Sequence, residues 1–167
     1  MDNSTQPKLT KKQNTWMAIK FVLFSASAGV IQFLSFTLLH EFTRLDTLTR
    51  LDKLFGNDYG LTYFIALVLS VLWNFTFNRK FTFKSASRVS VAMLLVFAFY
   101  LVFTPLSIWW GVTLTKLGWN YYLVLALTML VNLATEYLYD RYVVYGKSVY
   151  TNEEGQRELQ KNAGKTE

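Results

Sequence analysis

The sequence predicts an all-α integral membrane protein with four transmembrane helices. Four stretches of 19 to 27 residues contain no charged side chain: Phe21–Leu39, Tyr59–Phe77, Val89–Thr115 and Leu117–Thr135. A helix needs roughly 20 mostly apolar residues to cross the hydrocarbon core of a bilayer. Helices satisfy their own backbone hydrogen bonds in lipid, so each stretch is expected to be one membrane-spanning helix. The 167 residues leave no room for a separate soluble domain.

The positively charged residues predict the orientation of these helices. Thirteen of the 17 Lys and Arg residues lie before the first stretch, between the second and third, or after the fourth. Cytoplasmic segments of membrane proteins are enriched in Lys and Arg. We therefore expect both termini in the cytoplasm (N-in/C-in). The net charge of +6 is interpreted as a topology signal and not as a sign of a nucleic-acid partner.

The expected elements follow one another along the chain. Residues 1–15 are polar and are predicted to form a disordered cytoplasmic tail, and 16–146 form the membrane domain. Its spans are expected at about 17–39, 59–78, 89–112 and 119–140. The outer connection 41–58 has leucines at helical spacing, which fits either an interfacial helix or an extension of the first span. Pro105 predicts a break or a kink in the third span. Residues 147–167 form a charged cytoplasmic tail.

Aromatic residues are expected at both membrane surfaces. Trp109 and Trp119 surround the outer connection between the last two spans. Phe83 and Tyr145 follow the cytoplasmic ends of the second and fourth spans. Because aromatic rings collect at bilayer interfaces, all four are predicted to be membrane anchors.

A sequence motif occurs twice in the chain, at an offset of 62 residues. The first copy has polar residues at i, i+4 spacing followed by a cation: Ser70, Asn74, Asn78 and Arg79. Adding 62 to each number gives the second copy: Asn132, Glu136, Asp140 and Arg141. Each copy ends a hairpin that starts on the same side of the membrane, which predicts two hairpins related as a parallel repeat. Transporters with such repeats bind their substrates near the repeat interface.

Five basic residues are candidates for a lipid-phosphate site. Arg79 and Arg141 end the two returning spans, Lys20 and Arg88 begin the outgoing spans, and Lys80 follows Arg79. The predicted topology places them at the cytoplasmic headgroup layer. Arginine binds phosphate oxygens through two parallel hydrogen bonds, and basic pockets between helices hold lipid head groups. Ordinary positive-inside charge is the alternative interpretation.

The polar stripe and a patch of small residues allow further interpretations. Asn74, Asn132 and Glu136 lie inside apolar stretches, where unpaired polar groups are costly. They are expected either to hydrogen-bond between helices or to line a polar path. Ser25 and Gly29 form a small-xxx-small pair, which predicts a surface for close helix packing.

Enzymatic chemistry is not expected. The chain contains no cysteine, and its only histidine, His40, lies at an outer membrane edge. No spacing of ligand residues fits a metal site, and no pair of carboxylates faces inward at one depth. We expect no catalytic residue, no metal and no cofactor.

Residues 16–146 resemble the GtrA-like family of small four-span membrane proteins. The resemblance rests on I-K-F-V-L-F-S-A-S-A-G at 19–29 and on W-N-F-T-F-N-R-K-F-T-F at 73–83. The copy E-Y-L-Y-D-R-Y-V-V-Y at 136–145 fits more loosely, because Glu136 and Asp140 replace amides and would repel a phosphate unless protonated or paired. The matching site residues are Asn74, Asn78, Arg79 and Lys80, with Arg141 added by the internal repeat.

The resemblance implies that the protein flips a polyprenyl-phosphate-linked sugar across the cytoplasmic membrane for cell-surface polysaccharide modification. Expected partners are that lipid, the surrounding membrane lipids, a membrane glycosyltransferase and a second copy of the chain, with no nucleic acid. One alternative is an accessory subunit that docks a glycosyltransferase through the small-residue surface. Another is a small proton-coupled exporter, which typically has a carboxylate deep in its first span, where this chain has Gln32.

Overall fold

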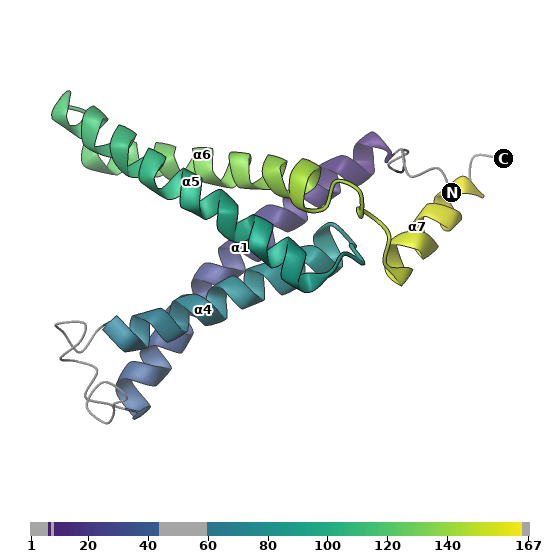
Figure 1. Ribbon diagram of the computed structural model, residues 1–167, viewed down its shortest axis with the longest axis horizontal. Coiled ribbons are helices and arrows are strands. Elements are labelled where there is room, and N and C mark those ends of the chain that lie inside the picture. The colour runs from purple at the N-terminus through teal and green to yellow at the C-terminus, as the bar shows by residue number, and fades with distance from the viewer. Residues whose placement is uncertain (1–6, 8, 44–59, 165–167) are drawn as a thin grey trace. The chain divides into compact units, whose positions relative to one another are not determined.

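The computed structural model describes residues 7, 9–43 and 60–164. This part of the chain is all-helical, as predicted (Figure 1). Its five α-helices are α1 (Lys11–Leu38), α4 (Gly60–Phe77), α5 (Val89–Lys116), α6 (Tyr121–Tyr139) and α7 (Glu153–Ala163). Three π-helical segments directly follow α1, α4 and α6: η1 (Leu39–Thr43), η2 (Asn78–Thr82) and η3 (Asp140–Val144).

Three helical segments in the described residues are long and apolar enough to cross a membrane: Lys11–Phe42, Val89–Lys116 and Tyr122–Val144. At 1.5 Å per residue, the 28 residues of α5 extend about 42 Å, more than the roughly 30 Å hydrocarbon core. Apolar side chains such as Leu94 and Val102 are 67% and 68% exposed on this helix. The protein is therefore an integral membrane protein. The predicted second span is the 18-residue, charge-free α4, which is not among these three segments, so the four-span arrangement and its orientation stay predictions.

Helix α1 begins at Lys11, inside the predicted disordered segment 1–15. The backbone N–H of Gln13 donates to Thr10 Oγ1 at 3.2 Å, and the backbone N–H of Thr10 donates to Gln13 Oε1 at 2.9 Å. This reciprocal pair is a capping box, which satisfies two backbone donors at the first turn of a helix. This capping box allows the helix to begin at Lys11, within the polar segment.

Two further predictions concern connections. The predicted interfacial helix over 41–58 lies outside the described residues except for 41–43, which belong to η1. Helix α5 runs without interruption from Val89 to Lys116 with Pro105 inside it. The expected break at Pro105 is therefore absent from α5.

The chain divides into two compact units, Ile19–Thr82 and the remainder, Met1–Ala18 with Phe83–Glu167. In the first unit, α4 packs against α1. Trp73 stacks on Phe77 with ring centroids 4.1 Å apart, and Phe24 of α1 lies 5.3 Å from the ring of Phe77. The indole N–H of Trp73 donates to Ser27 Oγ at 3.0 Å. Aromatic packing and this hydrogen bond hold the two helices together.

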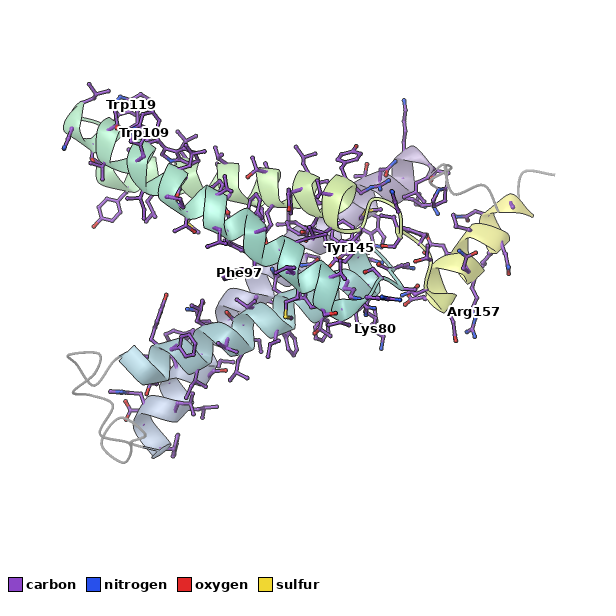
Figure 2. The ribbon with its side chains drawn as sticks, in the orientation of Figure 1. Lys80, Phe97, Trp109, Trp119, Tyr145 and Arg157 are labelled. Atoms are coloured by element: carbon purple, nitrogen blue, oxygen red, sulfur yellow. The ribbon has the colours of Figure 1, made fainter. Side chains whose placement is uncertain are left out.

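In the second unit, α5 and α6 run side by side as a hairpin (Figure 1). Gly118, at a φ of +87°, makes the turn between them in a left-handed conformation that favours glycine. The indole N–H of Trp110 donates to Thr128 Oγ1 at 2.9 Å across the hairpin. Trp109 and Trp119 lie at the hairpin end remote from α7, and Tyr145 lies at the opposite end (Figure 2). Trp109 and Trp119 therefore lie together at the connection between α5 and α6, as expected from the sequence.

The polar C-terminal segment packs on the residues that follow η2. Backbone N–H groups of Tyr150 and Asn152 donate to the carbonyl oxygens of Phe83 and Lys84, each at 2.9 Å. Asn152 then caps α7 by accepting from the backbone N–H of Gly155 at 2.8 Å. The charged tail 147–167 thus contains a docked helix, and contacts with residues 83–85 hold it in place.

Candidate functional site

The two motif copies share an unusual backbone conformation. Each copy is an α-helix followed by a five-residue π-helical segment, and these segments begin at Asn78 and Asp140, the residues that the 62-residue offset makes equivalent. Short π-helical insertions are rare and occur frequently at functional sites. The repeat predicted from sequence is therefore also a repeat of local structure.

In the first copy, the polar stripe forms a continuous hydrogen-bonded ladder. Thr82 Oγ1 donates to Asn78 Oδ1 at 2.8 Å, and Asn78 Nδ2 donates to Asn74 Oδ1 at 2.7 Å. Ser25 Oγ of α1 also donates to Asn74 Oδ1, at 3.3 Å. Asn78 and Thr82 are each 1% exposed. These contacts support helix-to-helix bonding as one role of the stripe, the first interpretation left open by the sequence.

Two other residues from the sequence analysis, Ser70 on α4 and Gly29 on α1, lie on the same pair of helices but further from η2. Ser70 Oγ lies 3.4 Å from Gln32 Oε1 of α1 and donates more strongly, at 2.8 Å, to the carbonyl oxygen of Leu67. Gly29 faces away from its neighbours, since a Cβ atom built on it would meet nothing within 4 Å. Ser25 thus contributes to packing inside the unit, whereas Gly29 leaves open space beside the helix.

Three of the predicted cations lie close to the end of the first copy. Lys20 Nζ of α1 donates to the carbonyl oxygen of Phe81 at 3.3 Å. Arg79 is half-buried within η2, and Lys80 is exposed, with its Nζ 5.2 Å from the ring centroid of Phe81. The fold therefore brings Lys20 to the η2 segment that contains Arg79 and Lys80, although 59 residues separate Lys20 from Arg79 in the sequence.

In the second copy, the polar stripe includes a buried acidic pair. Glu136 and Asp140 are each 5% exposed. Asn132 Nδ2 donates to Glu136 Oε2 at 3.4 Å, and Tyr100 on α5 lies close enough to Glu136 to interact with it electrostatically. Tyr100 has no counterpart in the motif and was not predicted. It could have been suspected only as a polar aromatic residue inside a charge-free stretch.

The remaining predicted cations belong to this second unit. Arg141 is 9% exposed and lies close enough to Tyr137 and Tyr150 to act on both electrostatically. Its guanidinium carbon lies 5.5 Å from the ring centroid of Tyr142. Arg88 is exposed and precedes α5. The predicted set of four cations is thus divided between the units, Lys20 and Arg79 in one and Arg88 and Arg141 in the other. A shared phosphate site for all four stays a prediction.

Phe83 and Tyr145, which come four residues after Arg79 and Arg141 and are also related by the 62-residue offset, are core residues. Phe83 and Tyr145 are both 0% exposed, and their rings stack with centroids 4.7 Å apart and planes 24° apart. Their predicted role as half-wet membrane anchors is wrong, because both rings are fully buried. Stacking of these two residues instead joins the segments that follow η2 and η3 within the second unit.

Lys84 is the centre of a cluster that the sequence did not predict. Its Nζ lies 2.5 Å from Glu158 Oε2 and 3.3 Å from Glu154 Oε1 on α7, and 5.4 Å from the ring centroid of Tyr150. Lys84 is 4% exposed and has a positive φ of 48°. Non-glycine residues rarely adopt this conformation, and such strain persists only where surrounding contacts hold it. The two ion pairs hold α7 against Lys84, the residue after Phe83.

Long apolar helices with outward-facing apolar side chains, together with a duplicated polar and basic motif, define a small helical membrane protein. The chain matches the family described as GtrA/DPMS, transmembrane domain, over residues 20–145, and it belongs to this family. The resemblance noted in the sequence is thereby confirmed. No curated protein and no solved structure matches the chain. GtrA proteins are small and generally non-catalytic membrane proteins, and membership connects this chain with polysaccharide or glycan synthesis.

Proposed function

We propose that this protein translocates a polyprenyl-phosphate-linked sugar across the cytoplasmic membrane, with both chain termini on the cytoplasmic side. The observation behind the proposal is the family match over residues 20–145, which includes both copies of the motif and both motif arginines. A lipid-linked sugar presents an anionic phosphate at the headgroup layer, a polar sugar and an apolar chain. The protein offers cations, a polar stripe and outward-facing apolar surface, one feature for each part of this cargo.

Arg79 is the residue expected to capture the phosphate. It directly follows the polar residues of the first motif copy, it is half-buried, and Lys20 and Lys80 add positive charge at the same helix end. Partial burial strengthens an ion pair because water screens it less than at the surface. The planar guanidinium also matches two phosphate oxygens, which a lysine ammonium does not. Arg141 holds the equivalent place in the second copy, and Arg88 adds charge at the start of α5.

Lipid analysis of the purified protein tests this assignment. The full chain, an Arg79→Ala variant and an Arg157→Ala variant are purified in mild detergent, and the bound lipids are identified by mass spectrometry. Arg157 is the matched control, since its side chain is 80% exposed and it lies on α7, outside the family match. We expect a polyprenyl phosphate lipid with the full chain and the control, and its loss from Arg79→Ala. Equal amounts in all three preparations would refute phosphate capture by Arg79.

One observation favours a second candidate function, that of an accessory subunit for a membrane glycosyltransferase. Gly29 is exposed on α1 and has open space around it, which would let a partner helix approach closely. A Gly29→Leu substitution would fill this space. Loss of a copurifying glycosyltransferase from Gly29→Leu, with translocation by the purified protein intact, would assign docking to this surface as a separate role.

A further inference from the structure

The acidic pair on α6 has an environment unlike that of the other acidic residues. Glu136 on α6 and Asp140, the first residue of η3, are one helical turn apart, so their side chains lie on the same face of this continuous helical segment. Both are 95% buried, whereas Glu153 and Glu154 on α7 are exposed. Neither Glu136 nor Asp140 forms an ion pair with any described residue. Two carboxyl groups are thus buried together in a helix that crosses the membrane.

The charged and titratable neighbours of this pair can be named. Helix α5 is packed against α6 and η3, and it contributes Tyr100, which interacts electrostatically with Glu136. On their own helix, Tyr137 and Arg141 are the nearest such groups in sequence, and Arg141 acts electrostatically on Tyr137. Tyr139 packs its ring against Phe99 of α5, at a centroid distance of 5.3 Å.

Hydrogen-bond donors are too few for the acceptors in this cluster. Glu136 accepts from Asn132 Nδ2. Oδ1 of Asp140 and Oδ1 of Asn132 are also buried, and neither has a hydrogen-bond partner among the described residues. Buried acceptors without a donor are rare in folded proteins and destabilise them. Asp140 and Asn132 each lie one turn from Glu136, so a hydrogen atom at this place would supply a missing donor.

We infer that Glu136 and Asp140 together hold one proton at neutral pH and form a protonation site within the α5–α6 hairpin. Two like charges in a low-dielectric site repel each other strongly, and carboxyl pairs in such sites share a proton. The proton removes one of two negative charges and converts one carboxyl group from an acceptor into a donor.

Protonation has a consequence for the neighbouring Arg141, and this step rests on the proposed function. With both carboxylates ionised, the second motif copy would present two negative charges beside its arginine and would repel a lipid phosphate. With one proton bound, the copy has a more positive local charge and can admit the phosphate. Release of the proton would then favour release of the phosphate, which links transport to the proton concentration.

Infrared spectroscopy of the purified full chain in detergent tests the protonation site without any cargo. A protonated carboxyl group has a carbonyl stretch separate from that of a carboxylate. We expect this band at neutral pH, its loss from the Glu136→Gln/Asp140→Asn double variant, and no change in Glu153→Gln. We also expect Tyr100→Phe, which keeps both acids, to shift the band because the polar hydroxyl group beside Glu136 is removed. Absence of the band from the unaltered chain, or its persistence in the double variant, would overturn the assignment.

Two further arms identify the ligand and its link to cargo. If adding sodium chloride at constant pH removes the band, a sodium ion takes the place of the proton. That result would overturn the assignment of the pair as a site for a proton. Binding of polyprenyl phosphate to the chain in nanodiscs should weaken more steeply with rising pH in the unaltered chain than in the double variant, in which only the phosphate's own second ionisation, at about pH 6, changes. If the infrared band is present but the lipid fails to bind at any pH, the proposed function fails and the protonation site stands.

Discussion

Phe83 and Tyr145 occupy equivalent positions in the two motif copies and stack on each other with ring centroids 4.7 Å apart. Both are fully buried. The backbone on either side of this stack is also joined, because the N–H of Tyr150 donates to the carbonyl oxygen of Phe83. The stack therefore joins three segments of the second unit: the residues that follow η2, the residue that follows η3 and the segment leading to α7.

Replacing the buried ring should destabilise the second unit. We expect Phe83→Ala to lower the free energy of unfolding by about 3–5 kcal/mol, because it removes apolar contacts and leaves a cavity. Reversible denaturant unfolding in detergent micelles measures this change. Phe97→Ala is the control, since Phe97 is 58% exposed on α5 and should cost about 0.5 kcal/mol or less. Equal losses for the two variants would show that the stack is not part of the core.

The ion pair between Lys84 and Glu158 should be stronger than an ordinary surface pair. The Lys84 side chain is 5% exposed and its Nζ lies 2.5 Å from Glu158 Oε2, so water screens the pair only partly. A double-mutant cycle with Lys84→Met and Glu158→Gln should give a coupling energy of about 1–2 kcal/mol.

The same cycle on Arg157 and Glu153 provides the control. Their side chains are 80% and 91% exposed, and their charged atoms lie 3.7 Å apart. Pairs of this kind contribute little, so their coupling should be close to zero. A coupling for Lys84 and Glu158 no larger than that of the control would mean that α7 is not held by this pair.

Tyr150 should make stability depend on alkaline pH. Burial, together with the negative charge of Glu158, raises the pKa of Tyr150 to about 12 from its ordinary value of 10.0. Between these values the folded protein keeps the phenol proton that the unfolded chain has lost. The contribution of Tyr150 to stability is therefore complete below about pH 10 and declines as the pH rises toward 12.

Unfolding measured from neutral pH to pH 12 for the unaltered chain and for Tyr150→Phe isolates this contribution. The two proteins differ only at this residue, so the difference between the two curves belongs to Tyr150. We expect the unaltered chain to lose more stability than the variant above pH 10. Parallel curves would contradict the raised pKa.

Local patterns in the sequence predicted much of this structure. Charge-free stretches predicted the long helices, and the 62-residue offset predicted two copies that prove to share a π-helical segment. The buried positions of Phe83 and Tyr145 could not be predicted, because an aromatic residue at a helix end fits both a membrane interface and a core. The Lys84–Glu158 pair was also missed, since 74 residues separate its members and no local pattern relates them.

The acidic pair shows the same division between local pattern and tertiary structure. Spacing alone predicted that Glu136 and Asp140 share a helix face with Asn132. The sequence could not show that both acids would be 95% buried, or that Tyr100 would reach Glu136 from another helix. Burial depends on which helices pack together, and that arrangement decides whether a carboxylate meets lipid, water or protein.

Translocation by the purified protein in liposomes tests the central claim most directly. Polyprenyl-phosphate-linked sugar with a label on the sugar is placed in both leaflets, and its accessibility to an added membrane-impermeant reagent is followed over time. We predict that liposomes with the full chain or with Arg157→Ala expose the inner-leaflet lipid, whereas liposomes with Arg79→Ala behave as protein-free liposomes do. Translocation by Arg79→Ala at the rate of the full chain, or none by the full chain itself, would contradict the proposed function.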